Sequence, residues 1–307
     1  MNFRQLSYFV GVVDAGSFSR AASLLRIAQP ALSQQIASLE AELGTQLLIR
    51  SQCGIQSTTA GAVLYRRARG VLHEIEQIRQ SVRTETELAG DVSIALPSSL
   101  AHTFAEPIVS ATRLRYSKIR LTLLEGASHL NRESLTRGLV DFALIYEDLA
   151  VPGLERHMLY RQQLFLVERT ARWRNQPGVI PFADLPARGL LLPPTGNVTR
   201  QTLDRAFRQI GTEPTIVAEA NSLTTLLSLV EAGLGAAILP WVGSITRPFR
   251  WLRIVDPSPA LNVSLCTASL LPRSEASELV LQLAFDVVLD RVRLPDWKGA
   301  IFDLTPP

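Results

Sequence analysis

The spacing of apolar residues changes twice along the 307-residue chain. Up to residue 58, apolar positions recur every three or four residues in short runs, which predicts short helices. Residues 59–89 carry one longer helical pattern. From Asp91 onward, short apolar runs alternate with helical patterns, which predicts βαβ units and a mostly parallel sheet. The expected strands are 92–96, 119–124, 141–146, 190–192, 217–219, 236–239 and 262–266.

Three short helices are predicted in the first stretch. Gly16 ends the first helix, Ser17 caps the second, and the third begins near Pro30 and stops before Gly44. Their buried faces are expected to be Leu6, Phe9, Val10 and Val13, then Phe18, Ala21, Ala22 and Leu25, then Leu32, Ile36, Leu39 and Leu43. Three such helices with a tight turn between the last two describe a helix-turn-helix.

The outer face of the third helix carries short or amide side chains without charge, namely Pro30, Ser33, Gln34 and Ser38. Such a helix enters the major groove of DNA with its N-terminal residues first, where Gln pairs with adenine and Ser with either base. The alternative is a plain three-helix bundle whose third helix has a solvated polar face. Residues 47–55 favour the DNA interpretation, because they predict a strand, a turn and a returning strand. That is a wing, and Arg50 would reach phosphate or the minor groove from it.

The long helix carries a narrow apolar seam. Its members alternate in spacing between three and four residues and are Leu64, Ala68, Val71, Ile75, Ile78 and Val82. A seam of this kind pairs two helices of a coiled coil, so we expect a second copy of the chain to pack on it. The alternative is packing against the helix's own domain. A paired helix-turn-helix would read an inverted repeat in double-stranded DNA.

Composition excludes several classes of protein. Hydrophobic residues make up 47% and charged residues 19%, so global disorder is excluded, and no apolar run is long enough to cross a membrane. The N-terminus lacks the layout of a signal peptide, so we expect a cytoplasmic protein. Cys53 and Cys266 form neither a disulfide framework nor a zinc site, and a redox pair is not favoured. Without GxGxxG, GxxxxGK or GxSxG motifs, we expect no cofactor, no metal and no enzyme activity.

Four short runs of residues between Ala28 and Gly61 resemble the N-terminal signature of the LysR-type transcriptional regulators. The matching runs are AQPALSQQI from Ala28, LEAELG from Leu39, LLIR from Leu47 and TTAG from Thr58. Within the family, AQPALSQQIASLE and LLIRS are most similar to nitrogen-assimilation control regulators. The resemblance carries DNA-reading roles over to Gln29, Pro30, Ser33 and Gln34, with Arg50 at the wing. One departure is that Ser51, Gln52 and Cys53 stand where the family's wing commonly has a further basic residue.

The resemblance also implies the architecture. It predicts a winged helix-turn-helix at 1–58, a dimerising linker helix at 59–89 and an effector-binding domain at 90–294. That domain would have the two-lobed α/β fold of periplasmic binding proteins, with two crossovers and a cleft. Lobe I would take about 90–160 and 267–294, and lobe II about 161–266. Residues 295–307 are expected to form a loosely held tail.

Turns that lead from strands into helices should line the cleft, because helix N-termini present N–H groups to a ligand. The residues expected there are Ser98, Ser99, Leu100, Ser128, Thr195 and Asn197, and the alternative for each is an ordinary helix cap. The ligand would be small and neutral or monoanionic, or there would be none. The expected function is a sequence-specific transcriptional regulator that forms a dimer or tetramer, with RNA polymerase open as a further partner. The alternative is a small-molecule receptor or enzyme that shares the two-lobed fold.

Overall fold

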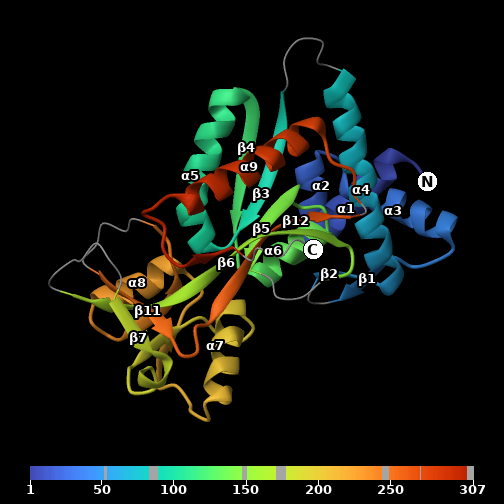
Figure 1. Ribbon diagram of the computed structural model, residues 1–307. Helices are drawn as coiled ribbons and strands as arrows, with labels where there is room; N and C mark the ends of the chain where they lie inside the picture. Colours follow the sequence, from blue (N-terminus) through green and yellow to red (C-terminus); the bar gives the residue numbers. More distant parts are fainter. Residues whose placement is uncertain are drawn as a thin grey trace. The chain divides into compact units, whose positions relative to one another are not determined.

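The computed structural model describes residues 1–51, 54–82, 89–146, 151–170, 178–243, 249–269 and 271–302 (Figure 1). The chain divides into two compact units, which are described separately below. The first comprises Met1–Glu87 with Leu271–Ser274, and the second comprises Leu88–Leu270 with Glu275–Pro307. Among the described residues, no helix is both long and apolar enough to cross a membrane.

The first unit is a helical bundle with a hairpin. Its elements are α1 (Phe3–Ala15), α2 (Phe18–Leu25), α3 (Gln29–Leu43), β1 (Leu48–Ser51), β2 (Gly54–Ser57) and α4 (Thr59–Val82). The helix ends follow the sequence: Gly16 and Gly44 end α1 and α3 with positive φ angles, and the Ser17 side chain accepts from Arg20 N. The predicted helices and wing strands are thus confirmed. The predicted linker helix 59–89 is too long, because Ala89 already belongs to a strand.

The core of this unit differs from the prediction at three positions, one of which is Leu25, only half-buried at the edge of the core. Val12 is fully buried, whereas Val13 is only half-buried and packs at the edge of the core. Leu43 was expected inside but is 39% exposed as the last residue of α3. The remaining apolar positions of α3, Leu32, Ile36 and Leu39, are buried as expected.

The second unit is an α/β domain. Its strands are β3 (Ala89–Leu96), β4 (Lys118–Glu125), β5 (Phe142–Tyr146), β6 (Leu154–Arg169), β7 (Gly178–Pro181), β8 (Leu190–Leu192), β9 (Ile216–Glu219), β10 (Ala236–Pro240), β11 (Phe249–Val255), β12 (Ala260–Ala268) and β13 (Ala300–Ile301). Its helices are α5 (Ser98–Arg115), α6 (Ser128–Thr136), α7 (Val198–Gln209), α8 (Leu223–Glu231) and α9 (Glu275–Arg293), with a 3-10 turn η1 (Phe182–Asp184). Every strand expected from the sequence is present.

The strands form two lobes that share the long strand β6. The strand order runs β4-β3-β5-β12-β6 in lobe I and β6-β10-β8-β9 in lobe II, where β11 and β7 lie on the other side of β6. The first half of β6 pairs with β12 and the second half with β10 and β11. A single strand therefore crosses from one lobe into the other, as the two-lobed fold requires.

The sheet is more mixed than predicted. β3 pairs in parallel with β4 and β5, and β8 with β9 and β10, but β6 and β12 run antiparallel to their main neighbours. Strand β6 was not expected, because its exposed first half carries polar residues. The sequence also assigned residues up to 266 to lobe II. The pairing of β12 with β5 instead puts residues 260–266 in the sheet of lobe I.

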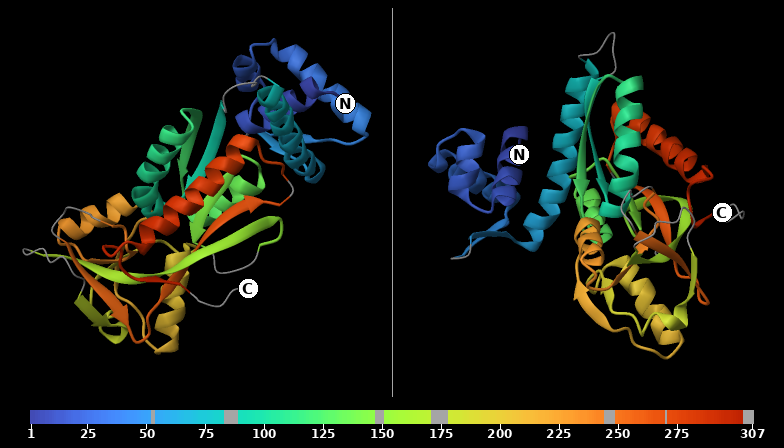
Figure 2. Two further views of the ribbon diagram at one scale, coloured as in Figure 1. Left: turned by 45° about the horizontal axis from the view of Figure 1, so that its top comes forward. Right: turned by 90° about the vertical axis from the view of Figure 1, so that its left-hand side faces the viewer.

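Helices α5 and α9 lie side by side over the sheet of lobe I (Figure 2). They bury Phe104, Ile108, Val280 and Ala284 against strand residues such as Ile94, Leu144 and Tyr146. The loosely held tail expected from Pro295 is wrong for residues 295–302. Trp297 is only 7% exposed and donates a hydrogen bond from Nε1 to Gln162 Oε1 at 3.0 Å, and β13 pairs with β6. The indole ring of Trp297 is thus buried among apolar side chains, and its N–H group has a hydrogen-bond acceptor in Gln162.

Candidate nucleic-acid interface and interlobe cleft

The third helix is held in place by the turn before it. Arg26 adopts a left-handed conformation with φ 54°, and Ile27 N donates to Ala22 O at 3.1 Å, which closes α2 and redirects the chain. With its apolar residues buried, α3 must present its other side to solvent. That side carries Gln29, Pro30 and Gln34, all exposed, and the half-buried Ser33. The structure thus brings the four predicted α3 residues onto one accessible surface.

The N-terminus of α3 is open to an external acceptor. Its N-cap residue, Ala28, has no side chain that could bind the first-turn N–H groups, and Pro30 stands in the first turn. Helix N-termini that lack an internal cap favour an anion because of their N–H groups and the helix dipole. The same end of the helix therefore offers amide side chains to bases and N–H groups to a phosphate.

The wing is fastened to α3 by a residue that the sequence reasoning missed. Glu40 Oε1 accepts hydrogen bonds from Leu47 N at 2.7 Å and Leu48 N at 3.1 Å. β1 and β2 then pair in antiparallel register, with Arg50 opposite Ile55. The position of the Arg50 side chain and residues 52–53, including Cys53, lie outside what the structure describes. A carboxylate on the last turns of α3, seven residues before two backbone donors, is the signal that could have identified Glu40.

The predicted seam of α4 divides into two parts. Ala68 is 2% exposed and Leu64 is partly buried, and both pack in the core of their own unit with Tyr65 and Leu72. Val71 is 47% exposed and Ile75 is half-buried. The side chains of Ile78 and Val82 lie outside the described part. For Leu64 and Ala68 the alternative interpretation holds, because their apolar surface is already used within one chain.

A polar cluster joins α1 to α4. The Tyr65 hydroxyl donates to Asp14, and Arg69 Nη1 donates to Asp14 Oδ2 at 3.3 Å. Burial raises the pKa of the Tyr65 phenol above its usual value, and the hydrogen bond to Asp14 acts in the same direction. The phenol is therefore protonated at neutral pH and remains a donor to Asp14. This cluster sets the direction in which α4 leaves the helix-turn-helix.

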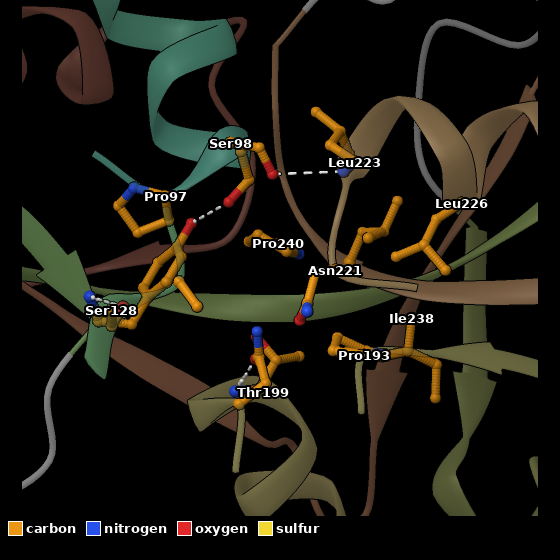
Figure 3. A pocket seen from close by; sticks show the side chains of 15 residues that line it. Pro97, Ser98, Ser128, Pro193, Thr199, Asn221, Leu223, Leu226, Ile238 and Pro240 are labelled. Carbon is orange, nitrogen blue, oxygen red and sulfur yellow. Dashed lines mark hydrogen bonds between the residues drawn. The ribbon is translucent and has the colours of Figure 1, made fainter. Parts of the chain in front are cut away.

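A cleft lies between the lobes of the second unit (Figure 3). About 500 Å³ of empty space, part of it open to solvent, lies among the first residues of four helices and the end of β10. Its lining residues are Pro97, Ser98, Ser99, Ala127, Ser128, Tyr146, Pro193, Asn197, Thr199, Asn221, Leu223, Leu226, Ile238, Leu239 and Pro240. Apolar side chains therefore share the wall with hydroxyl and amide groups, and a concave site with convergent polar groups is typical of small-molecule binding.

The polar groups of lobe I are bonded to one another. Ser99 Oγ and the Tyr146 hydroxyl are 2.9 Å apart, and Ser128 Oγ accepts from Tyr146 N at 3.1 Å. Burial raises the pKa of Tyr146, against a smaller opposite effect of Ser99, so the phenol is neutral at physiological pH. Tyr146 thus organises this wall of the cleft, although the apolar pattern predicts for it only the end of a strand.

The structure brings together four of the six residues predicted for the cleft: Ser98, Ser99, Ser128 and Asn197. Leu100 and Thr195 are not among the lining residues. Leu100 is 3% exposed and packs in the core, because the first turn of α5 rotates it away from Ser98. Thr195 is exposed to solvent in the loop before α7. Thr199 and Asn221 were missed, although the turn at Asn221 had the right chemistry.

Among the residues that the structure describes, Tyr146 is the one ionisable side chain in the lining. The nearest candidate, Arg200, is 9% exposed and pairs with Asp204 at 2.8 Å and with Glu219. It also donates to Pro193 O at 3.2 Å, so it supports the wall from behind. The cleft therefore offers hydroxyl, amide and backbone N–H groups rather than a cationic side chain.

Asp141 and His102 carry groups of the kind that hydrolases use, and they lie in different surroundings. Asp141 accepts hydrogen bonds from Ser93 N at 2.8 Å and Ser93 Oγ at 2.6 Å, and His102 is exposed on α5. Within the described ranges, no three His, Cys, Asp or Glu residues gather as a metal site would require. Cys266 is 1% exposed on β12.

These two units define a class of protein: a winged helix-turn-helix for DNA joined to a two-lobed ligand-binding domain. Comparison with known proteins identifies the family. Residues 3–62 match the bacterial regulatory helix-turn-helix model of the lysR family, and residues 85–288 match the LysR substrate binding domain. The chain belongs to the LysR family and is a DNA-binding transcriptional regulator with an effector-binding domain.

The chain is similar over nearly its whole length to individual members. It is 35% identical to the nitrogen assimilation regulatory protein nac of Escherichia coli K12, covering 95% of this chain and 98% of that protein. A full-length OxyR variant of Pseudomonas aeruginosa has a TM-score of 0.73 at 21% identity, over 94% of this chain and 98% of its own. Full-length CbnR, solved in complex with its target DNA, has a TM-score of 0.63 at 23% identity, over 95% and 99%. These two structures are similar in fold.

Proposed function

We propose that the protein is a dimeric regulator that reads an inverted repeat in promoter DNA with α3. Two copies of residues 1–58, joined through the linker helix α4 (Thr59–Val82), would place two recognition helices on successive major grooves. Gln29, Pro30, Ser33 and Gln34 would contact bases, and Arg50 would contact phosphate or the minor groove. CbnR, which is similar in fold, has been solved in complex with its target DNA, and this supports DNA as the partner.

One observation carries the proposal: α3 exposes uncharged hydrogen-bonding side chains at an N-terminus without a side-chain cap. Exposed amide side chains suit base edges, and free first-turn N–H groups suit a phosphate. Glu40 fixes the wing against the same helix, so the two contact elements are oriented together.

A gel-shift assay tests the proposal. The full chain should retard DNA from upstream of its own gene, and a symmetric fragment of that DNA should compete far better than a scrambled one. Equal competition by both fragments would contradict base readout. Raising the salt concentration should weaken binding to both, because phosphate contacts release counterions.

For assembly, we propose that the outer part of α4 pairs with a second copy. Val71 supports this, because it is 47% exposed on a helix whose neighbouring Ala68 is already buried. Val71→Asp should convert the dimer to a monomer with a folded helix-turn-helix, as measured by sedimentation and circular dichroism. Ala68→Asp, the matched change on the buried side, should unfold the unit. A Val71→Asp chain that still sediments as a dimer would contradict pairing through α4.

For the cleft at 90–294, we propose a small neutral or monoanionic effector. The support is the described part of the lining, which has hydroxyl and amide groups without a cationic side chain, and Arg200 is engaged by Asp204 and Glu219. A thermal-shift screen of small acids, amides and polyols on the full chain tests this. Stabilisation by a dicarboxylate in preference to its monoamide would contradict the assignment.

We further propose that the protein acts in the cytoplasm as a regulator and not as an enzyme, with RNA polymerase as a partner. The relatives support the regulatory role by their names. Reporter expression from the gel-shift promoter, with and without the gene for this chain, would show activation or repression. An unchanged reporter at a promoter that the protein binds would contradict regulation.

A further inference from the structure

The hydrogen bond between Ser98 and α8 joins the two lobes across the cleft. Ser98 is the first residue of α5 in lobe I, and its Oγ accepts from Leu223 N at the start of α8 in lobe II, at 3.2 Å (Figure 3). In sequence the two residues are far apart, so only the closed arrangement of the lobes brings them together. Ser99, the next residue, does not take part, because its Oγ is paired with Tyr146 within lobe I.

The N-terminus of α8 depends on this bond for a side-chain acceptor. Its own N-cap, Ser222, is exposed and makes no capping hydrogen bond. Helix α7, also in lobe II, shows the contrast: its N-cap Asn197 accepts from Thr199 N at 2.9 Å within the same helix. A first-turn N–H group of a helix needs an acceptor, and α8 obtains one from the other lobe.

Each end of the bond is anchored in a rigid core. Leu100 and Phe104 hold α5 in lobe I at 3% and 0% exposure, and Leu226 and Val230 hold α8 in lobe II at 2% and 0%. The backbone at each end of the Ser98–Leu223 bond is therefore held by its own lobe. The bond breaks when the lobes move apart, or when the Ser98 side chain turns to another rotamer and a water molecule takes its place.

We propose that Ser98 is an interlobe latch whose hydroxyl caps α8 in the closed domain and couples closure to occupancy of the cleft. The hydroxyl uses its oxygen to accept from Leu223, which leaves its proton to be donated to an oxygen of a bound molecule. The two hydrogen bonds strengthen each other, since each polarises the shared hydroxyl. A molecule with an acceptor oxygen at Ser98 thus favours the closed lobes, as an allosteric shift requires. This coupling rests on the proposed effector role of the cleft, but the latch itself does not.

The latch is tested without DNA or effector, by residue-resolved hydrogen exchange on the full chain. Ser98→Ala should speed exchange of the first-turn amides of α8 by roughly two- to ten-fold, the range set by loss of one net hydrogen bond. Ser98→Thr keeps the hydroxyl and should keep the protection. Ser99→Ala, the matched change one residue later, should leave α8 unchanged and alter exchange around Tyr146 instead. All three variants are compared by circular dichroism to confirm that they fold.

Two outcomes would overturn the proposal. The first is unchanged exchange at α8 in a folded Ser98→Ala chain. The second is an equal rise at α8 in Ser99→Ala, which would show general loosening of α5 rather than loss of a latch. Gel-shift activity is measured on the same preparations. A failed latch with intact DNA binding would leave the proposed regulatory function standing, and loss of DNA binding by the parent chain would not affect the exchange result.

Discussion

The recognition helix and the interlobe cleft place their polar residues in opposite ways. On α3, Gln29, Pro30 and Gln34 stand exposed on a scaffold that is complete without them. In the cleft, Ser99, Ser128 and Tyr146 are buried and bonded to one another. Residues of the first kind can change binding without changing stability. The buried cleft residues stabilise the domain and also line the cleft, so changing one of them alters both stability and ligand binding.

The largest loss of stability is expected at Gly61, where the first unit leaves no room for a side chain. A Cβ at Gly61 would lie 2.0 Å from the Leu47 carbonyl oxygen, where the chain leaves the wing for α4. Gly61→Ala should therefore cost more than about 4 kcal/mol and abolish DNA binding, while the second unit stays folded. Chemical denaturation of the full chain, followed with gel-shift assays, measures both. Ala62→Ser, on the exposed side of the same turn, is the control and should behave like the parent.

A somewhat smaller loss of stability is expected when the C-terminal segment 295–302 is changed. Trp297 packs against Phe104 and Tyr160, with ring centroids 5.7 and 6.4 Å away, and its N–H is bonded to Gln162. Trp297→Ala should destabilise the effector domain by about 3–5 kcal/mol and leave the helix-turn-helix transition in place. Leu294→Ala, at 50% exposure, should change the free energy of unfolding by less than about 0.5 kcal/mol. If the two variants unfold at similar denaturant concentrations, residues 295–302 contribute little to stability and form a loosely held tail after all.

The recognition unit was predictable because its signals are local. Gly16, Ser17 and Gly44 act on the backbone next to them, and the apolar spacing of α3 alone determines which face is outward. The cleft was only half predictable. Turns after strands could be recognised one by one, but which of them meet depends on the crossing of β6 and the pairing of β12. Leu100 and Thr195 lie beside true lining residues in the sequence, but rotation of the first turn of α5 buries Leu100 and the loop before α7 leaves Thr195 in solvent.

A single contact residue should show the independence of the recognition surface. Gln29→Ala should weaken binding to the cognate site by about 1–3 kcal/mol and change binding to random DNA little. Its free energy of unfolding should stay within about 0.5 kcal/mol of the parent, because the side chain is exposed. Titrations against both DNAs measure this, with Ser38→Ala further along α3 as the control. A parallel loss on both DNAs would place Gln29 on the phosphate backbone instead.

The smallest expected effect is the one that separates the two regions most clearly. Tyr146→Phe removes the hydroxyl that is paired with Ser99 Oγ at 2.9 Å, and it leaves the ring in the core of lobe I. The cost to the effector domain should be about 1 kcal/mol, the worth of one buried hydrogen bond. Ser99→Ala should cost a similar amount, and the double variant less than the sum, since each single change strands the other hydroxyl. Urea denaturation of the four chains measures the coupling. If the losses of unfolding free energy simply add, the hydroxyls of Ser99 and Tyr146 act independently of each other. The proposed difference between the cleft and the recognition helix would then be wrong.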